Sequence, residues 1–165
     1  MKMRIAGIVD DSIVDGDGLR LSVFTQGCPH HCVGCQNPDT HAASGGRDED
    51  TENILARIDE NPLLTGITFS GGEPFLQPAP LTRLAKEAHK RGLDVWSYTG
   101  YTLEELLAKK NPAIDALLRE LDVLVDGPYE ERLRDLTLNF RGSSNQRIID
   151  MNAFRKTGKI RTLEF

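Results

Sequence analysis

The sequence alternates short apolar runs, rich in β-branched and aromatic residues, with longer stretches of helical periodicity. This alternation is typical of βα units whose strands pair in parallel. A complete eightfold βα barrel needs about 250 residues and rarely has fewer than 200, whereas this chain has 165. The pattern therefore predicts an α/β fold, a partial open parallel barrel of the (βα)6 type, formed by one domain over residues 1–165.

Individual elements follow from local signals. Strands are predicted at residues 19–25, 66–70, 93–98 and 123–125, with weaker candidates at 147–150 and 160–165. Helices are predicted at residues 51–60, 80–91 and 102–121, the last one interrupted at Pro112. Gly92 stands where a C-terminal cap belongs, and Thr102 with Glu105 forms a Thr-x-x-Glu capping pattern. Functional residues are expected in the loops that follow the parallel strands.

Charge and hydropathy exclude several classes of partner. The formal net charge of −5 comes from 25 acidic and 20 basic residues spread along the chain, so we expect no nucleic-acid partner. The apolar stretch near the start ends at Asp10 and Asp11 before it reaches the length of a signal-peptide core. No later run approaches the length of a membrane span. We therefore expect a cytoplasmic protein with no membrane partner.

Three cysteines, Cys28, Cys32 and Cys35, lie within eight residues. In a cytoplasmic chain they are better explained as reduced metal ligands than as a disulfide framework, which would leave one thiol over. Three thiolates on one loop can hold an iron-sulfur cubane and leave one iron free for an exogenous ligand. The alternative is a structural zinc site whose fourth ligand is His30, His31 or His41. Structural zinc usually draws its ligands from two separated pairs, which favours the cluster.

Three further motifs follow predicted strands or lie near the end of the chain. The first is Ser70-Gly71-Gly72-Glu73-Pro74, in which the glycines permit positive φ and close backbone approach to a ligand, and Glu73 adds a carboxylate. The others are a Tyr-Thr-Gly-Tyr run at residues 98–101 with a Val-Asp-Gly turn at 125–127, and a polar run, Arg-Gly-Ser-Ser-Asn-Gln, at 141–146. Taken alone, each is more often an ordinary turn or a solvated loop.

The cysteine spacing and the Gly-Gly-Glu-Pro segment, in this chain order, resemble those of the radical S-adenosylmethionine (SAM) superfamily. With the motifs at 98–101, 125–127 and 141–146, residues 7–150 resemble the activating proteins of anaerobic (class III) ribonucleotide reductases. The resemblance implies a partial barrel of the radical SAM kind and two cofactors, a 4Fe-4S cluster and SAM.

The resemblance also implies site residues. The cluster ligands, and catalytic residues, would be Cys28, Cys32 and Cys35. The cofactor would be lined by Gly34, Cys35 and Gln36. Its methionine end would be held by Gly71, Gly72 and Glu73. Contacts to its ribose or amino acid moiety would come from Ser97 or Thr99 and from Asp126. Asn37 and Thr40 fit the family pattern, but Gly34 and His41 stand where aromatic residues are common.

The implied activity is that of an oxidoreductase that installs a glycyl radical. A reduced electron donor such as flavodoxin would supply the electron for SAM cleavage, and the 5′-deoxyadenosyl radical would remove hydrogen from a glycine of anaerobic ribonucleoside-triphosphate reductase. Three alternatives remain: an activator of a formate-lyase type enzyme, a radical enzyme acting on a pterin-derived nucleobase precursor, and a non-catalytic metal-binding or electron-transfer module. The run at 141–146 argues against the first two.

Overall fold

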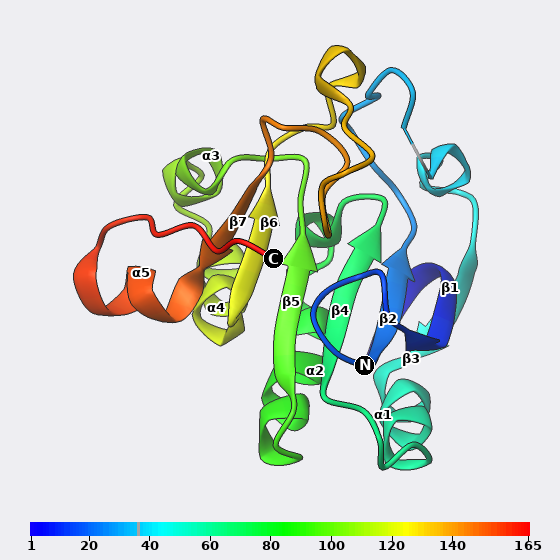
Figure 1. Ribbon diagram of the computed structural model, residues 1–165. Coiled ribbons are helices and arrows are strands. Elements are labelled where there is room, and N and C mark those ends of the chain that lie inside the picture. The colour runs from blue at the N-terminus through cyan, green and yellow to red at the C-terminus, as the bar shows by residue number, and fades with distance from the viewer. Residues whose placement is uncertain (36) are drawn as a thin grey trace.

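A computed structural model of the chain describes residues 1–35 and 37–165. Its centre is a mixed sheet with the strand order β3-β1-β2-β4-β5-β6-β7 (Figure 1). The strands are β1 (Lys2–Ser12), β2 (Arg20–Thr25), β3 (Arg47–Asp50), β4 (Gly66–Gly71), β5 (Asp94–Tyr98), β6 (Val123–Asp126) and β7 (Arg147–Asp150). The neighbours β2, β4, β5 and β6 are parallel, whereas β1, β3 and β7 pair antiparallel. The parallel strands therefore form a continuous block with antiparallel strands on both sides.

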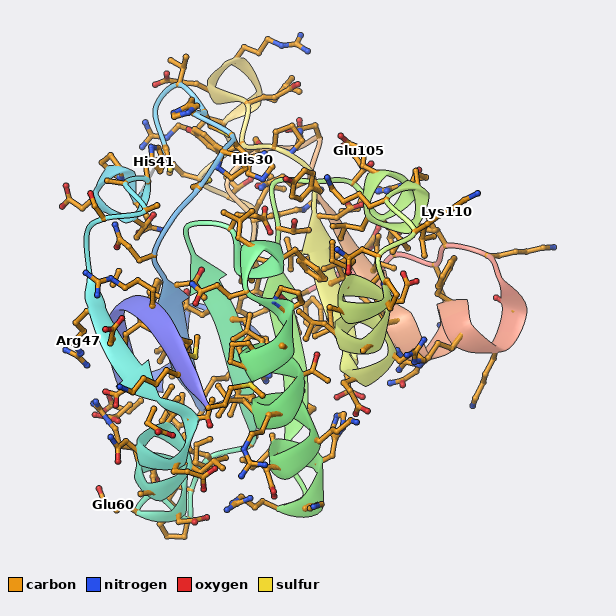
Figure 2. The ribbon with its side chains drawn as sticks, turned by 180° about the vertical axis from the view of Figure 1, so that it is seen from behind. His30, His41, Arg47, Glu60, Glu105 and Lys110 are labelled. Carbon is orange, nitrogen blue, oxygen red and sulfur yellow. The ribbon has the colours of Figure 1, made fainter. Side chains whose placement is uncertain are left out.

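The helices connect these strands. They are α1 (Thr51–Asp59), α2 (Pro78–Lys90), α3 (Leu103–Ala108), α4 (Pro112–Glu120) and α5 (Met151–Thr157). Short 3-10 turns occupy Pro38–Thr40, Pro74–Leu76 and Glu131–Leu133. Helices α1, α2 and α4 lie on the same face of the sheet, as seen from behind in Figure 2. No helix in the described part of the chain is long and apolar enough to cross a membrane.

Local capping signals explain where several helices begin and end. The Thr102 hydroxyl accepts from Glu105 N–H while the Glu105 carboxylate accepts from Thr102 N–H, which confirms the predicted capping box. Gly92 follows α2 with a φ of +75°, as expected for a C-terminal cap. Pro112 begins a separate helix, where its missing N–H costs nothing.

The core has two parts because the strands are covered on both faces. The main cluster fills the space between the sheet and the helices and includes Leu124 of β6. The neighbouring residues Val123 and Val125 point to the other face, where they form a smaller cluster with Trp96 and Ile148. The segment after α5 returns across that face, and Leu163 N–H donates to the carbonyl of Ile148 at 2.7 Å (Figure 1).

The observed fold differs from the prediction in several places, among them β3 and α5, for which no strand or helix was predicted. A six-unit parallel barrel is not confirmed, since the parallel part has the four strands β2, β4, β5 and β6 within a mixed α/β sheet. Residues 2–12, for which no strand was predicted, form β1. Its antiparallel pairing with β2 and β3 joins residues far apart in sequence, so no local sequence pattern indicates it. The predicted strand at 160–165 is wrong, because this segment forms one isolated bridge, Thr162 to Ile149, and no continuous ladder. The single-domain assignment stays a prediction.

Candidate active site

A cavity of about 430 Å³ lies at the carboxyl ends of the parallel strands. It is lined by all three cysteines and by residues of the loops after β4, β5 and β6, among them Gly71, Gly72, Thr99, Gly127 and Tyr129. Figure 2 shows the labelled His30 and His41 at this same end of the molecule. The expectation that the loops after the parallel strands meet at one site is confirmed.

The cysteine loop leaves β2 and is closed at its base by backbone hydrogen bonds. Gly27 N–H donates to the Thr40 carbonyl at 2.6 Å, and Cys28 N–H donates to the His41 carbonyl at 3.1 Å. Near the end of the loop, Cys35 N–H donates to the Cys32 carbonyl at 3.2 Å. The loop that begins at Cys28 and ends at His41 is therefore closed at its base, and its three thiols line the cavity. Gln36, a predicted cofactor contact, lies outside the described residues.

The thiol environment bears on metal binding. Burial raises the pKa of the Cys28 thiol and is also the main cause of the raised pKa of Cys32. The nearby Glu73 carboxylate acts in the same direction on both groups. Since the thiolate is the form that ligates metal, a bound metal cation would act against these raised pKa values and favour ionisation.

The donor set fits an iron-sulfur cluster. Three cysteine thiols from one loop line one cavity, and three thiolates are a donor set that can hold a cubane with one open iron. Within residues 1–35 and 37–165, no three His, Cys, Asp or Glu side chains are grouped to hold a single metal ion. His41 is one of the three histidines considered as the fourth ligand of a structural zinc site. Its Nε2 lies 3.3 Å from Cys35 Sγ, so the ring contacts a sulfur atom.

The glycine segment after β4 packs directly on the strand that delivers the cysteines. Gly72 N–H donates to the Thr25 carbonyl at 2.9 Å and Glu73 N–H to the Gly27 carbonyl at 2.8 Å. Gly71 has a φ of +101°, as the paired glycines predicted. A Cβ added to Gly72 would lie 2.3 Å from the Gly27 carbonyl oxygen. Close backbone approach is thus required at this position even without a ligand.

The Glu73 side chain is fully buried and does not line the cavity. Its carboxylate accepts hydrogen bonds from Phe75 N–H at 3.0 Å, Gly100 N–H at 2.8 Å and the Thr99 hydroxyl at 2.9 Å. His30 Nε2 lies 2.6 Å from Glu73 Oε1. The carboxylate therefore holds together loops that follow three different strands.

Ser97 and Asp126 are also absent from the cavity lining. The buried Ser97 hydroxyl donates to the Tyr98 carbonyl at 3.1 Å. Asp126, 1% exposed, accepts from Leu103 N–H at 2.7 Å and pairs with Arg147, whose Nε lies 2.9 Å from Asp126 Oδ1. This ion pair and a second one to Glu104 raise the pKa of Arg147 above its usual range.

The Gly34 backbone turns toward Glu131, whose carboxylate lies 2.6 Å from the position of an added Cβ. Of the predicted residues, the structure thus brings together Cys28, Cys32, Cys35, Gly71, Gly72 and Thr99. Sequence reasoning missed Asp15 as a lining residue. It lies in an irregular acidic loop after β1, and no motif distinguished it from its neighbours.

Known proteins are similar to this chain over most of its length. Residues 14–149 match the family model of the 4Fe-4S single cluster domain. The anaerobic ribonucleoside-triphosphate reductase-activating protein of Salmonella typhimurium is 37% identical over 142 residues, which cover 81% of this chain and 90% of that protein. The chain belongs to the family of anaerobic ribonucleoside-triphosphate reductase-activating proteins.

Other members of the activating-protein family show similar likeness. The Escherichia coli K12 protein is 36% identical over 143 residues, covering 81% of this chain and 90% of its own length. The protein of enterobacteria phage T4 is 33% identical over 142 residues, covering 82% and 86%. Among solved structures, QueE from Escherichia coli aligns with 62% of this chain and 54% of its own, at 19% identity and a TM-score of 0.48. That likeness is too distant to bear on the chemistry.

Proposed function

We propose that this protein is a radical SAM enzyme that installs a glycyl radical on anaerobic ribonucleoside-triphosphate reductase. The observation that carries the proposal is the cavity in which three thiols of one loop face the glycine segment after β4. Membership of the activating-protein family supports the choice of reaction and of protein substrate. When bound, the reduced cluster would supply the electron for reductive cleavage of SAM, the chemistry needed to remove hydrogen from a glycine α-carbon.

The residues of this chain would bind and orient the two cofactors. In this proposal the cluster ligands are Cys28, Cys32 and Cys35. The backbone of Gly71 and Gly72 receives the methionine end of SAM, where the lack of side chains leaves room for close contact. Thr99 lines the same cavity, and Gly34 and Gln36 flank the third cluster ligand in sequence. These assignments agree with the donor set of the cavity.

Other predicted site residues would act by holding the loops and strand ends around the cavity in place. Ser97 and Asp126 are buried near the ends of β5 and β6, where the Ser97 hydroxyl donates to the Tyr98 carbonyl and the Asp126 carboxylate pairs with Arg147. The Glu73 N–H donates to the Gly27 carbonyl and its carboxylate accepts from the surrounding loops, so Glu73 would hold in place the segment that contains Gly71 and Gly72. We propose one radical SAM domain over residues 1–165 and a reduced electron-transfer protein such as flavodoxin as the donor of electrons to the cluster.

The substrate can be tested directly. Reconstituted, reduced protein incubated with SAM and anaerobic ribonucleoside-triphosphate reductase is expected to yield a glycyl-radical doublet in the electron paramagnetic resonance (EPR) spectrum. A formate-lyase under the same conditions is expected to give none, because the relatives at 36–37% identity are named as activators of the reductase. A doublet on the formate-lyase alone would overturn the choice of partner. Protein that binds a cluster but cleaves no SAM would overturn the radical SAM assignment.

A further inference from the structure

His30 reaches from the cysteine loop to the glycine segment. It lies between two proposed cluster ligands in sequence, yet its Nε2 is 2.6 Å from Oε1 of Glu73. The side chain of His30 is 15% exposed and that of Glu73 is 0% exposed. Since a carboxylate oxygen only accepts hydrogen bonds, the imidazole N–H is the donor. Water does not reach the carboxylate, so the contact is made in a mostly desolvated environment.

Neighbouring residues fix the imidazole in this position. The Tyr101 ring meets His30 edge-on, with ring centroids 4.5 Å apart and an interplanar angle of 76°. On another side, the Gly100 backbone lies so close that an added Cβ would stand 2.4 Å from Cδ2 of the imidazole. Gly100 N–H also donates to Glu73 Oε1. The loop after β5 therefore borders the space that His30 occupies, and its Gly100 N–H donates to the same oxygen, Glu73 Oε1, as His30 does.

The other Glu73 donors belong to loops that carry no cluster ligand. Phe75 lies in the segment after β4, while Thr99 and Gly100 follow β5. Among the described residues, His30 is the one donor to Glu73 that the cysteine loop provides. A buried carboxylate that loses a donor is costly. The hydrogen bond from His30 therefore links the cysteine loop to the segment proposed to bind SAM.

We propose that His30 is a positioning residue that sets the cluster relative to the SAM-binding backbone by holding the cysteine loop to Glu73. The inference rests on the proposed function of this cavity and deepens it. The Nε2 atom of His30 is engaged by the carboxylate and so is not free to ligate the cluster; ligation through Nδ1 would show as loss of iron in the variant described below. Losing the tie would leave the three cysteines able to assemble the cluster, but it would loosen the arrangement that SAM must bridge.

The test compares His30→Ala with His30→Gln and with the matched control His31→Ala from the same loop. Iron content, SAM affinity by calorimetry and the EPR spectrum of the reduced cluster with and without SAM are measured on reconstituted protein. We expect all variants to keep their iron. His30→Ala should bind SAM roughly 10-fold more weakly, because the cysteine loop is no longer held to the glycine segment, and should show a smaller SAM-induced spectral change. His30→Gln keeps an N–H donor and should restore most of the affinity, and His31→Ala should resemble wild type.

A second variant moves the imidazole without removing it. Gly100→Ala would press its Cβ into the ring and is expected to weaken SAM binding like His30→Ala. In the double variant His30→Ala/Gly100→Ala no ring remains to be displaced, so the second change should add little. Additive losses, or wild-type SAM affinity and spectra in His30→Ala, would overturn the inference. Loss of iron from His30→Ala alone would make His30 a ligand and overturn it too. Wild-type protein that cleaves no SAM would instead overturn the proposed function.

Discussion

Replacing any one of Cys28, Cys32 or Cys35 by serine is expected to abolish SAM cleavage. Each change removes one of the three proposed sulfur ligands, and serine is a harder donor that suits iron-sulfur clusters poorly. Losses of outer-shell partners of metal ligands typically cost 10- to 100-fold, so the loss of a ligand should exceed roughly 100-fold. Iron and sulfide content after anaerobic reconstitution, followed by measurement of 5′-deoxyadenosine release, tests this expectation.

The matched control for Cys35 is His41→Ala. His41 contacts Cys35 Sγ at 3.3 Å, so the variant should keep its cluster and lose at most the effect of an outer-shell partner. If His41→Ala lost all metal while Cys35→Ser kept a cluster, the ligand assignment would be wrong. Wild-type protein that binds zinc and stays colourless after reconstitution would favour the structural zinc site instead.

Local signals were enough to predict the parallel strands and several helix ends. The strand before the cysteines, predicted at 19–25, is Arg20–Thr25, and the helix predicted at 80–91 is Pro78–Lys90. Apolar periodicity and capping residues act over a few positions, so they can be recognised in sequence. Because parallel strands place their following loops at one edge, the position of the candidate site could be predicted as well.

Long-range packing could not be predicted in the same way. Trp96, Phe140 and Phe165 form an aromatic cluster with ring centroids 5.3–5.5 Å apart, although they are far apart in sequence. The Asn139 amide donates to the Phe165 carbonyl at 2.8 Å and ties the C-terminal segment to the polar loop. Nothing in the spacing of these residues distinguishes them from exposed aromatic side chains.

The directions in which polar side chains point could not be predicted from the sequence either. Glu73 and Asp126 were predicted to contact the cofactor, but both carboxylates accept hydrogen bonds from this chain's own backbone. In the run at 141–146, Arg141 donates to the Gln146 carbonyl at 2.7 Å and Asn145 to the Pro128 carbonyl at 2.7 Å. These contacts hold the loop in shape beside the cavity. Recognition of the reductase by this loop stays a prediction.

Gly72→Val is expected to damage the site even though it removes no functional group. The first new atom would stand 2.3 Å from the Gly27 carbonyl oxygen and 2.9 Å from that of Thr40, and both are backbone atoms at the base of the cysteine loop. The strain comes from close approach, since the positive φ belongs to Gly71. Overpacking of this kind typically costs about 1–3 kcal/mol of stability. Because Gly27 directly precedes Cys28, SAM affinity should fall more than 10-fold, on the order of 1.4 kcal/mol or more.

The control is Gly7→Val, because Gly7 lies in β1 with nothing within 4 Å of an added Cβ. Thermal unfolding and calorimetric titration with SAM are compared for the two variants and wild type, with cluster content measured on the same samples. Gly7→Val should match wild type in all three, since valine also suits a strand. If Gly72→Val bound SAM as tightly as wild type, the glycine segment would not form the SAM-binding surface. If Gly7→Val failed in the same way as Gly72→Val, general destabilisation rather than the close contact at Gly27 would explain both losses.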